Sequence, residues 1–334
     1  MGYRAALIGC GKIGSEFADD PLMSGDVFTH AEGYVRCPDT ELVAVCDSDP
    51  HKLQRCGDRW NVSQRYQSLS EMLASEQLDI VSVCTPDATH FEILRTLLTG
   101  PLPIKAILCE KPFVSSSAQA EEILSLASQR NVEVVVVFLR RYAENVRNLK
   151  ALLDQGKLGS IQAISGWYTK GTLHNGSHWI DLVRFLSGEI KWVEATNELG
   201  EEGADPTLDL RLGLEGGGVA SLRACKAELF TVFEMDIMTT RGRIQLLDSG
   251  YSIVVSEVQP SSRYSGYSEL KPTPVDFGDR RNVMLHAVED LVSSLKTGNS
   301  PASTARSASR TLKVSLAAHE AAQSGRRVPL EFEH

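Results

Sequence analysis

Three glycines near the start of the chain have the spacing of a phosphate-binding turn. The apolar run 3–8 leads into Gly9, Gly11 and Gly14, the pattern GxGxxG. The first glycine lets the chain leave a strand sharply, the second lets a pyrophosphate approach the backbone, and the third lets the next helix pack close to the sheet. The N-terminus of that helix would point its positive end at the phosphates. The pattern predicts a dinucleotide site, with a purely structural glycine-rich turn as the alternative.

An acid at the end of the second strand would complete this fingerprint, and two residues compete for the role. The usual spacing of about 20 residues points to Glu32, which lies in a helix-like stretch. Asp47 instead closes the apolar run 41–46, and the polar insert 17–26 explains the extra length as a loop within the first helix. A carboxylate at Asp47 can accept both ribose hydroxyls of NAD and would repel the 2′-phosphate of NADP. We therefore predict NAD rather than NADP, with an ordinary turn-starting aspartate as the alternative.

Two more polar segments follow apolar, strand-like runs. The segment 85–90 (TPDATH) follows the run 80–84, and the segment 110–112 (EKP) closes the run 106–109. The carboxyl ends of parallel strands are where doubly wound folds bind ligands. Lys111 precedes a proline, which restricts its backbone to extended geometry. Its ammonium could hydrogen-bond a substrate oxygen and the nicotinamide ribose; a surface Lys-Pro turn is the alternative.

A cluster of polar side chains marks the start of a later helix. His174, Asn175, His178 and Asp181 lie in the stretch GTLHNGSHWIDL. A single histidine is commonly a satisfied core or surface side chain, but a cluster at a helix start favours a functional site. Histidines four residues apart could share a zinc ion, yet His174 is expected to precede the helix and no third ligand is evident in the sequence. We therefore predict no metal site.

The elements that would position these residues alternate between strands and helices in the first third of the chain. Strands are predicted at 3–9, 41–46, 79–84, 104–109 and 132–138, and helices at 12–18, 29–36, 50–58, 68–76, 87–99 and 117–129. Continuous apolar strands that alternate with helices indicate a parallel, doubly wound sheet with helices on both faces.

The pattern changes after the predicted strand at 132–138. Helices are predicted at 143–155, 176–187, 281–296 and 303–323, strands at 161–170, 191–198, 207–214, 218–228, 231–239, 242–247 and 251–257, and a loop or edge excursion at 259–272. Glycine-containing turns at 216–218 and 240–242 predict hairpins. The predicted fold class is α/β, with an N-terminal Rossmann-type parallel sheet and a C-terminal α+β domain with a large open, mostly antiparallel sheet.

The composition of the chain argues against nucleic-acid binding and against insertion into a membrane. The chain has 334 residues, 42% hydrophobic and 23% charged, with a formal net charge of −9. This acidic balance argues against nucleic-acid binding, which favours a basic face. Seven cysteines form no CxxC pair, and no apolar run is long enough to cross a bilayer. The sequence runs directly into its first strand, so we expect a cytoplasmic protein without a signal peptide and without a membrane partner.

Taken together, the motifs resemble the glucose–fructose oxidoreductase / inositol dehydrogenase / rhizopine-catabolism (Gfo/Idh/MocA) family. GxGxxG at 9–14, CTP…H at 84–90, EKP at 110–112 and GxHxxD at 176–181 occur in that order before an antiparallel second half. The resemblance covers essentially the whole chain. It implies NAD(P)-dependent oxidation or reduction at a carbinol or carbonyl carbon of a sugar, sugar nucleotide or cyclitol.

The resemblance also implies roles for individual residues. Lys111 matches the family's catalytic lysine, and His178 matches the histidine that donates or accepts the proton, with His174 as a third catalytic candidate. The cofactor-binding candidates are Gly9, Gly11, Lys12, Ile13, Gly14, Asp47, Thr85, Pro86, His90, Glu110 and Lys111. The substrate-binding candidates are Lys111, Arg141, Tyr168, Asn175 and His178.

Finally, the resemblance implies two domains with different functions and a homo-oligomer. Residues 1–125 would form the NAD(P)-binding domain, and residues 126–334 the domain for binding a polyhydroxylated small molecule and for forming a homodimer or homotetramer through its sheet. One position departs from the pattern, because His174 stands where the family often has an aspartate. That departure leaves one alternative, a dinucleotide-binding regulatory or scaffolding protein without turnover.

Overall fold

The computed structural model describes residues 2–332 and divides the chain into two compact units. The first unit comprises the chain up to Ala143 together with Arg281–Ser309, and the second comprises Glu144–Arg280 together with the chain from Arg310 onward. The segments 126–143 and 281–309 therefore pack with the first unit. The functional division at residues 125 and 126 stays a prediction.

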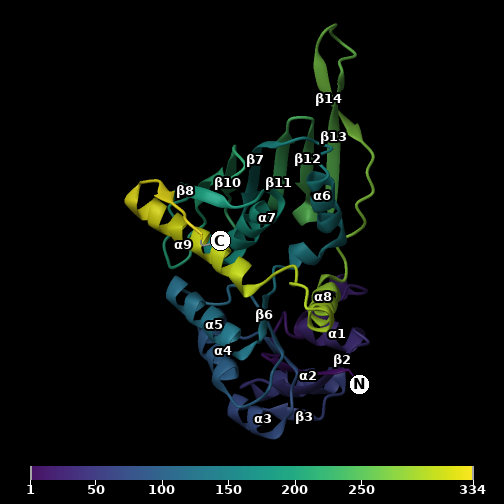
Figure 1. The fold of residues 1–334 in the computed structure, drawn as a ribbon, viewed down its shortest axis with the longest axis vertical. Coiled ribbons are helices and arrows are strands. Elements are labelled where there is room, and N and C mark those ends of the chain that lie inside the picture. The colour runs from purple at the N-terminus through teal and green to yellow at the C-terminus, as the bar shows by residue number, and fades with distance from the viewer. Residues whose placement is uncertain (1, 333–334) are drawn as a thin grey trace. The chain divides into compact units, whose positions relative to one another are not determined.

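The first unit is built on a six-stranded parallel sheet (Figure 1). Its strands are β1 (Tyr3–Ile8), β2 (Thr40–Cys46), β3 (Gln64–Tyr66), β4 (Ile80–Val83), β5 (Ala106–Cys109) and β6 (Glu133–Val136). The order β3-β2-β1-β4-β5-β6 reverses between β1 and β4, which creates the crevice where doubly wound folds bind ligands. Every residue of β4 and β5 is buried, as expected for strands covered on both faces. The predicted Rossmann-type sheet is confirmed.

Helices connect these strands, and their ends follow local sequence signals. The helices of this unit are α1 (His30–Arg36), α2 (Pro50–Trp60), α3 (Leu69–Ser75), α4 (His90–Thr99), α5 (Ser117–Arg130) and α8 (Val283–Thr297). The side chain of Asp49 accepts hydrogen bonds from the first N–H groups of α2, and Pro50 occupies its first position. Asn61 then ends α2 in a left-handed conformation. The short edge strand β3 was not predicted, because its three residues carry no apolar alternation.

The helix predicted at 12–18 is wrong. Turns and two short 3₁₀ segments, η1 (Glu16–Asp19) and η2 (Pro21–Met23), replace it. The backbone N–H groups of His30 and Ala31, at the start of α1, donate to the carbonyls of Ile13 and Gly14 at 3.1 and 3.0 Å. The helical hydrogen bonding of the glycine turn thus resumes at residue 30, which confirms the prediction that the insert is a loop within the first helix.

Residues 281–309 follow most of the second unit in the sequence but pack with the first unit. Helix α8 packs against α1, and a Cβ added at Gly33 of α1 would lie 3.1 Å from side-chain atoms of both Met284 and Val288. A β-bridge joins Thr304 to Val135 of β6, and the hydroxyl of Ser303 donates to the carbonyl of Val136. Residues 281–309 are therefore part of the packed structure of the parallel-sheet unit.

The second unit contains a nine-stranded mixed sheet (Figure 1). Its strands are β7 (Ile161–Tyr168), β8 (Ile190–Thr196), β9 (Asp209–Leu214), β10 (Val219–Ala224), β11 (Phe233–Thr239), β12 (Gly242–Leu247), β13 (Ser252–Pro260), β14 (Ser268–Thr273) and β15 (Val328–Pro329). The order is β14-β13-β12-β11-β7-β10-β9-β8-β15; β7 and β10 pair in parallel and the other neighbours are antiparallel. Helices α6 (Glu144–Asp154) and α7 (Ser177–Ser187) belong to this unit, and α9 (Ala305–Ser324) contributes its part from Arg310 onward. The predicted sheet and both predicted hairpins are confirmed.

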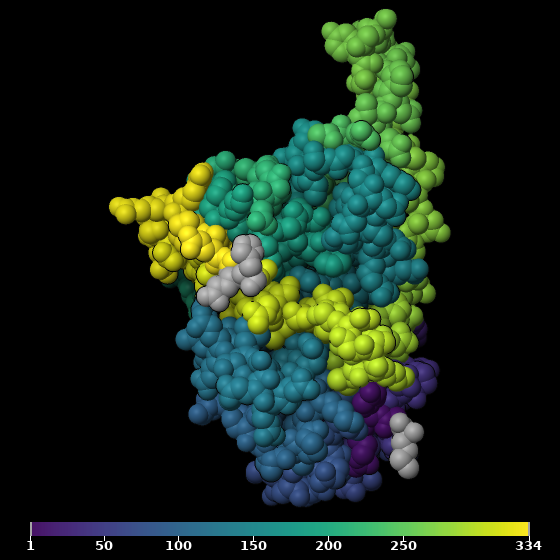
Figure 2. All heavy atoms as spheres, viewed as in Figure 1, coloured from purple at the N-terminus to yellow at the C-terminus, as the bar shows by residue number. Residues whose placement is uncertain are grey.

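The segment 259–272, predicted to be a loop or an edge excursion, forms part of a hairpin at the edge of the sheet. Strand β13 continues to Pro260, and β14 pairs with it from Ser268 to Thr273. The resulting hairpin projects beyond the neighbouring strands of its own sheet in Figures 1 and 2. The serines and prolines that suggested a loop are tolerated because β14 lies at a sheet edge, where a missing N–H or an exposed side chain costs little.

Candidate functional site

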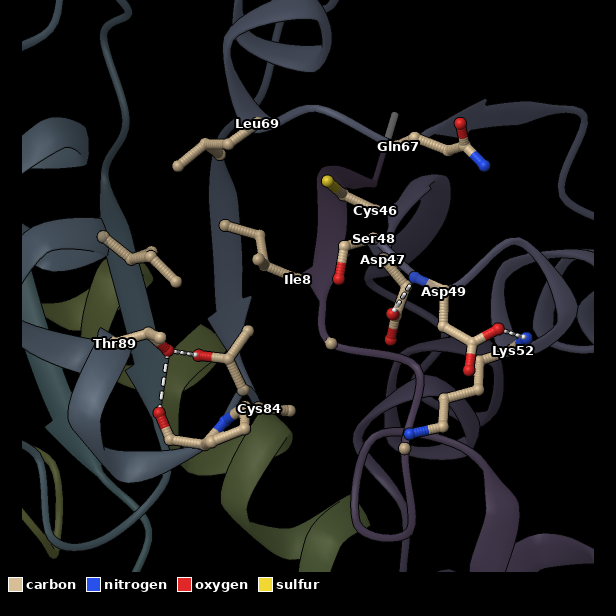
Figure 3. Close-up of a pocket in the computed structure, with 15 residues that line it drawn as sticks. Ile8, Cys46, Asp47, Ser48, Asp49, Lys52, Gln67, Leu69, Cys84 and Thr89 are labelled. Carbon is tan, nitrogen blue, oxygen red and sulfur yellow. Dashed lines mark hydrogen bonds between the residues drawn. The ribbon is translucent and has the colours of Figure 1, made fainter.

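A pocket of about 580 Å³ lies at the carboxyl ends of β1, β2 and β4 (Figure 3). It is lined by Ile8, Gly9, Gly11, Cys46, Asp47, Ser48, Asp49, Lys52, Gln67, Leu69, Cys84, Thr85, Pro86, Thr89 and Ile93. The pocket therefore occupies the crevice at the point where the strand order reverses. It brings together five of the predicted cofactor-binding residues, namely Gly9, Gly11, Asp47, Thr85 and Pro86.

The three glycines of the turn have different physical roles. Gly9 has φ of +95°, and a Cβ there would lie 2.6 Å from the backbone of Cys84. A Cβ at Gly14 would lie 2.1 Å from the carbonyl oxygen of Gly9. A Cβ at Gly11 would meet no atom within 4 Å. Gly9 and Gly14 are thus required by the protein's own packing, whereas Gly11 faces open space on the side of the pocket.

Asp47 closes β2 and is tied to the glycine turn. Its Oδ2 accepts a hydrogen bond from the backbone N–H of Cys10 at 2.7 Å, and its Oδ1 accepts one from Asp49 at 2.8 Å. These bonds hold the carboxylate at the rim of the pocket, as Figure 3 shows for the contact with Asp49. Each carboxylate oxygen has a second lone pair, so Asp47 can still accept a hydroxyl hydrogen.

Sequence reasoning missed several residues on the Asp47 side of the pocket. Ser48, Asp49 and Lys52 line it beside Asp47, and Gln67 follows β3 (Figure 3). Lys52 lies in the first turn of α2, only five residues after Asp47 in the sequence. This short separation could have suggested that Lys52 lies near the same pocket. Gln67 carried no such signal, because β3 itself was not predicted.

These residues provide two features of a dinucleotide-binding site, a backbone that phosphates can approach and a carboxylate for the ribose. Gly11 offers a backbone surface that no side chain occludes, and the carboxylate of Asp47 stands at the end of the neighbouring strand. Of the other predicted cofactor-binding residues, Lys12 lines a separate shallow hollow with Glu16, Phe17, Asp19, Asp20 and Arg55. Ile13, Gly14, His90, Glu110 and Lys111 are outside the set that lines the pocket, and their cofactor contacts stay predictions.

His90 lies behind the pocket wall and joins two loops. Its side chain is fully buried, with Nε2 2.8 Å from the carbonyl of Thr85 and Nδ1 2.8 Å from the carbonyl of Pro112. Thr85 itself is bonded to Thr89 through their hydroxyls at 2.8 Å (Figure 3). His90 therefore connects the loop after β4 to the loop after β5, the two loops that carry the predicted motifs.

A chain of buried polar groups ends at Glu110. The hydroxyl of Tyr34 lies 2.7 Å from the hydroxyl of Ser82, which lies 2.8 Å from Nδ1 of His30. Nε2 of His30 lies 3.2 Å from Oε1 of Glu110. A neutral imidazole satisfies every link if Tyr34 donates to Ser82, Ser82 to His30 and His30 to Glu110. No local pattern singles out His30, because its partners lie 52 and 80 residues away.

The same contacts set the charge of Glu110, which immediately precedes Lys111. Burial alone raises the pKa of Glu110, but the hydrogen bond from His30 and the nearby ammonium of Lys111 outweigh it, so the pKa lies below its usual range. Oε2 of Glu110 also accepts the backbone N–H of Lys111 at 3.3 Å, and the peptide bond between Lys111 and Pro112 is cis. The carboxylate thus holds the backbone from which the Lys111 side chain extends.

In the second unit, His174 lies on a π-helical turn that runs into α7, and His178 lies in the first turn of α7. Gly171–Gly176 forms this turn, and α7 begins at Ser177. His174 is exposed, whereas Asn175 and His178 are half-buried. His174 is therefore part of a continuous helical segment rather than of a preceding loop. π-Helical turns are rare and are frequent at functional sites.

Two residues predicted to contact the substrate are deeply buried. Tyr168 has no exposed surface, and its hydroxyl is bonded to Thr172 Oγ1 and to the carbonyl of Leu208, each at 2.8 Å. Burial raises the pKa of Tyr168, which keeps its hydroxyl protonated. Arg141 is 6% exposed and donates to the carbonyl of Ala302 and to Ser307 Oγ, each at 2.9 Å. This geometry favours supporting roles, and direct substrate contacts by either residue stay predictions.

The parallel sheet, its strand order and the pocket at its switch point define a dinucleotide-binding protein of the Rossmann type. Residues 3–138 match the model of the family described as "Oxidoreductase family, NAD-binding Rossmann fold". Over these residues the chain is similar to the Gfo/Idh/MocA oxidoreductases. Among the described residues, none of the helices has the length and apolar character needed to cross a membrane.

Individual proteins are similar to this chain over almost its whole length, and the solved structures among them share its fold. Myo-inositol 2-dehydrogenase from Thermotoga maritima is 22% identical, with 98% of each chain covered. The structure of an NAD-binding oxidoreductase from Klebsiella pneumoniae has a TM-score of 0.81 at 17% identity, covering 99% of this chain and 100% of that one. The WlbA dehydrogenase from Bordetella pertussis, in complex with NADH and UDP-GlcNAcA, has a TM-score of 0.76 at 18% identity, covering all of both chains.

Proposed function

We propose that this chain is an NAD-dependent oxidoreductase that transfers hydride between nicotinamide and a carbinol or carbonyl carbon of a sugar, sugar nucleotide or cyclitol. The observation that carries the proposal is the pocket in which Gly11 presents an unobstructed backbone and Asp47 stands at the end of β2. The substrate class is supported by relatives such as the myo-inositol 2-dehydrogenase and the dehydrogenase bound to a sugar nucleotide.

Within this proposal the bound nicotinamide supplies the redox chemistry, and the chain's own residues supply positioning and charge. Gly11 and Asp47 would bind the pyrophosphate and the adenosine ribose. Lys111 would hydrogen-bond the reacting oxygen and stabilise the negative charge that develops on it. His178 would exchange a proton with that oxygen as general acid or base, with His174 as its neighbour.

Three further assignments are part of the same proposal. The carboxylate of Asp47 favours NAD over NADP, because a 2′-phosphate would meet a like charge. The nine-stranded sheet of the second unit is the surface through which we expect a homodimer or homotetramer to form. A cytoplasmic location is consistent with seven cysteines that are all free, six of them buried.

Binding and turnover measurements test the proposal together. NADH binding is measured by fluorescence, and turnover is then measured with NAD on a panel of cyclitols, sugars and sugar nucleotides. We expect tight NADH binding, turnover on at least one compound, and a loss of about 100-fold or more in turnover for Lys111→Ala, with NADH affinity little changed. Lys105→Ala is a matched control, because Lys105 is an exposed lysine that precedes β5 and pairs with Asp79. Binding without turnover across the panel would instead favour a regulatory or scaffolding protein.

A further inference from the structure

The π-helical turn that carries His174 is capped by a segment far away in the sequence. The first N–H groups of a helix have no partner within the helix and need one elsewhere. Here Gly171 donates to Thr207 Oγ1 at 3.0 Å, and Thr172 donates to the carbonyl of Pro206 at 3.2 Å. Leu173 and His174 donate to the two carboxylate oxygens of Asp205, at 2.7 and 2.9 Å. Residues Asp205–Thr207, called here the capping segment, thus satisfy four consecutive N–H groups.

The turn needs this external support. Lys170 and Gly171, which open it, have left-handed φ values of +69° and +78°. The left-handed region is unfavourable for a residue with a side chain such as Lys170, so surrounding contacts must compensate. The first hydrogen bond from within the segment is that of the Asn175 N–H to the carbonyl of Lys170, at 3.3 Å. Before that point the capping segment supplies the hydrogen bonds that the turn itself does not.

Asp205 is the central group of the capping segment, and its surroundings keep it ionised. Burial raises its pKa, but the nearby imidazole of His319 and the hydrogen bonds from the N–H groups of Leu173 and His174 outweigh burial and lower it. His319 Nε2, on α9, lies 3.5 Å from Asp205 Oδ1. A Cβ at Gly171 would lie 2.1 Å from Asp205 Oδ2, so the turn and the carboxylate are in close contact. A negative charge at this end of the helical segment also interacts favourably with the helix dipole.

We propose that Asp205 is a positioning residue, which fixes the turn 171–176 and thereby the orientation of His178 at the start of α7. This inference rests on the proposed function for its catalytic consequence, but the positioning itself can be observed without turnover. The resemblance to the family implies an aspartate where this chain has His174. In this chain Asp205 places a carboxylate against the backbone N–H of His174.

The test compares two carboxylate substitutions in the full-length protein. Asp205→Asn keeps the shape of the side chain but places an NH₂ group against one of the two backbone N–H groups. Asp209→Asn is the matched control, since Asp209 also accepts a backbone N–H, from Ala224 at 2.7 Å, and pairs with Arg223, without contacting the turn. Gly171→Ala perturbs the same contact from the other side. The readouts are the NMR signal of the His178 ring, amide hydrogen exchange at Leu173 and His174, and kcat and KM.

We expect Asp205→Asn and Gly171→Ala to speed amide exchange at residues 173 and 174 by at least about tenfold and to shift the ring signal of His178. Turnover should fall about 10- to 100-fold with the KM for NAD unchanged, whereas Asp209→Asn should leave all three readouts near wild type. An unchanged His178 signal in a folded Asp205→Asn protein would overturn the proposal, as would faster exchange with wild-type turnover. If the ring signal shifts but the wild-type protein turns over no compound, the positioning role stands and the proposed function fails.

Discussion

The imidazole Nε2 of His30 lies 3.2 Å from Oε1 of Glu110, which links α1 to the loop that carries Lys111. The contact is buried, since the His30 side chain has no exposed surface and that of Glu110 is 12% exposed. Through this contact a buried side chain of α1 lowers the pKa of Glu110, the residue that precedes the candidate catalytic Lys111.

Removing the imidazole should weaken the fold at neutral pH and reduce the further loss of stability in acid. We expect His30→Gln to lower the free energy of unfolding by roughly 1–3 kcal/mol at neutral pH, because buried polar groups lose their partners. The pKa of Glu110 is lowered in the folded state, so its charge contributes stability at pH values above its unfolded-state pKa of about 4.3. That contribution is lost as the pH falls through the lower folded-state pKa. Without His30 the pKa of Glu110 rises toward its unfolded-state value or above it, so the part of the acid-induced loss of stability that comes from Glu110 should become smaller.

Denaturant unfolding at a series of pH values measures this effect. The double variant His30→Gln/Glu110→Gln is the control, because it lacks the titrating carboxylate and shows only the acid-induced loss that other groups cause. An acid limb for His30→Gln that coincides with that of the wild type would mean that His30 does not stabilise the charge on Glu110.

Two glycines of the turn should respond to the same substitution in opposite ways. Gly14→Ala should destabilise the fold by about 1–3 kcal/mol, because its Cβ would overlap the carbonyl of Gly9. Gly11→Ala should leave stability within about 1 kcal/mol, since its Cβ meets no atom, but it should weaken NADH binding at least about tenfold. Thermal unfolding and fluorescence titration separate the two effects. Unimpaired NADH binding by a folded Gly11→Ala protein would place the pyrophosphate elsewhere.

The charge at the end of β2 should set the choice of dinucleotide. We expect the wild-type protein to prefer NADH to NADPH, and Asp47→Asn to reduce that preference by about tenfold because the repulsion of a 2′-phosphate is removed. Asp49→Asn is the control, since Asp49 lines the same pocket but caps α2. The dissociation constants of both dinucleotides decide the matter. A wild-type preference for NADPH, or an unchanged ratio in Asp47→Asn, would show that Asp47 does not read the ribose.

The two histidines of the second unit should control the pH profile. In alcohol oxidation His178 acts as a base, so it must be neutral. A carboxylate at residue 174 would favour the protonated form of His178, and His174→Asp should therefore move the acidic limb of kcat/KM to higher pH. His178→Ala should remove most activity at every pH. If the two histidines titrate as a coupled pair, the apparent pKa of the acidic limb describes the pair and not either residue alone. A limb that stays in place or moves down in His174→Asp would show that the two side chains do not interact.

Local sequence patterns predicted much of the fold and of the pocket. The glycine turn, the apolar strands and Asp47 each depend on residues close together in the chain, so spacing and apolar patterning were sufficient. The inserted loop at 17–26 was predicted because its proline, its glycine and its polar residues interrupt the helical pattern. An edge excursion at 259–272 was one of two alternatives, but strand β14 itself was not predicted, because its composition is that of a loop and only its pairing at the sheet edge makes it a strand.

The supporting contacts could not be predicted in this way. His30 lies 80 residues from Glu110, and Asp205 lies 31 residues from His174. Neither residue belongs to a motif, and each acquires its role only when the chain has folded. For the same reason the burial of Tyr168 and Arg141, which had been predicted to face the substrate, depends on tertiary contacts that their sequence neighbours do not reveal.

Transfer of a labelled hydride tests the central claim most directly. The protein is incubated with NADH deuterated at one face of nicotinamide C4 and with the keto form of the compound that the panel identifies, and the product is analysed by mass spectrometry and NMR. The proposed function predicts one deuterium at the former carbonyl carbon when one face is labelled and none when the other is, with the signal lost in Lys111→Ala. Label that never reaches the product carbon, despite NADH binding, would contradict a hydride-transferring enzyme.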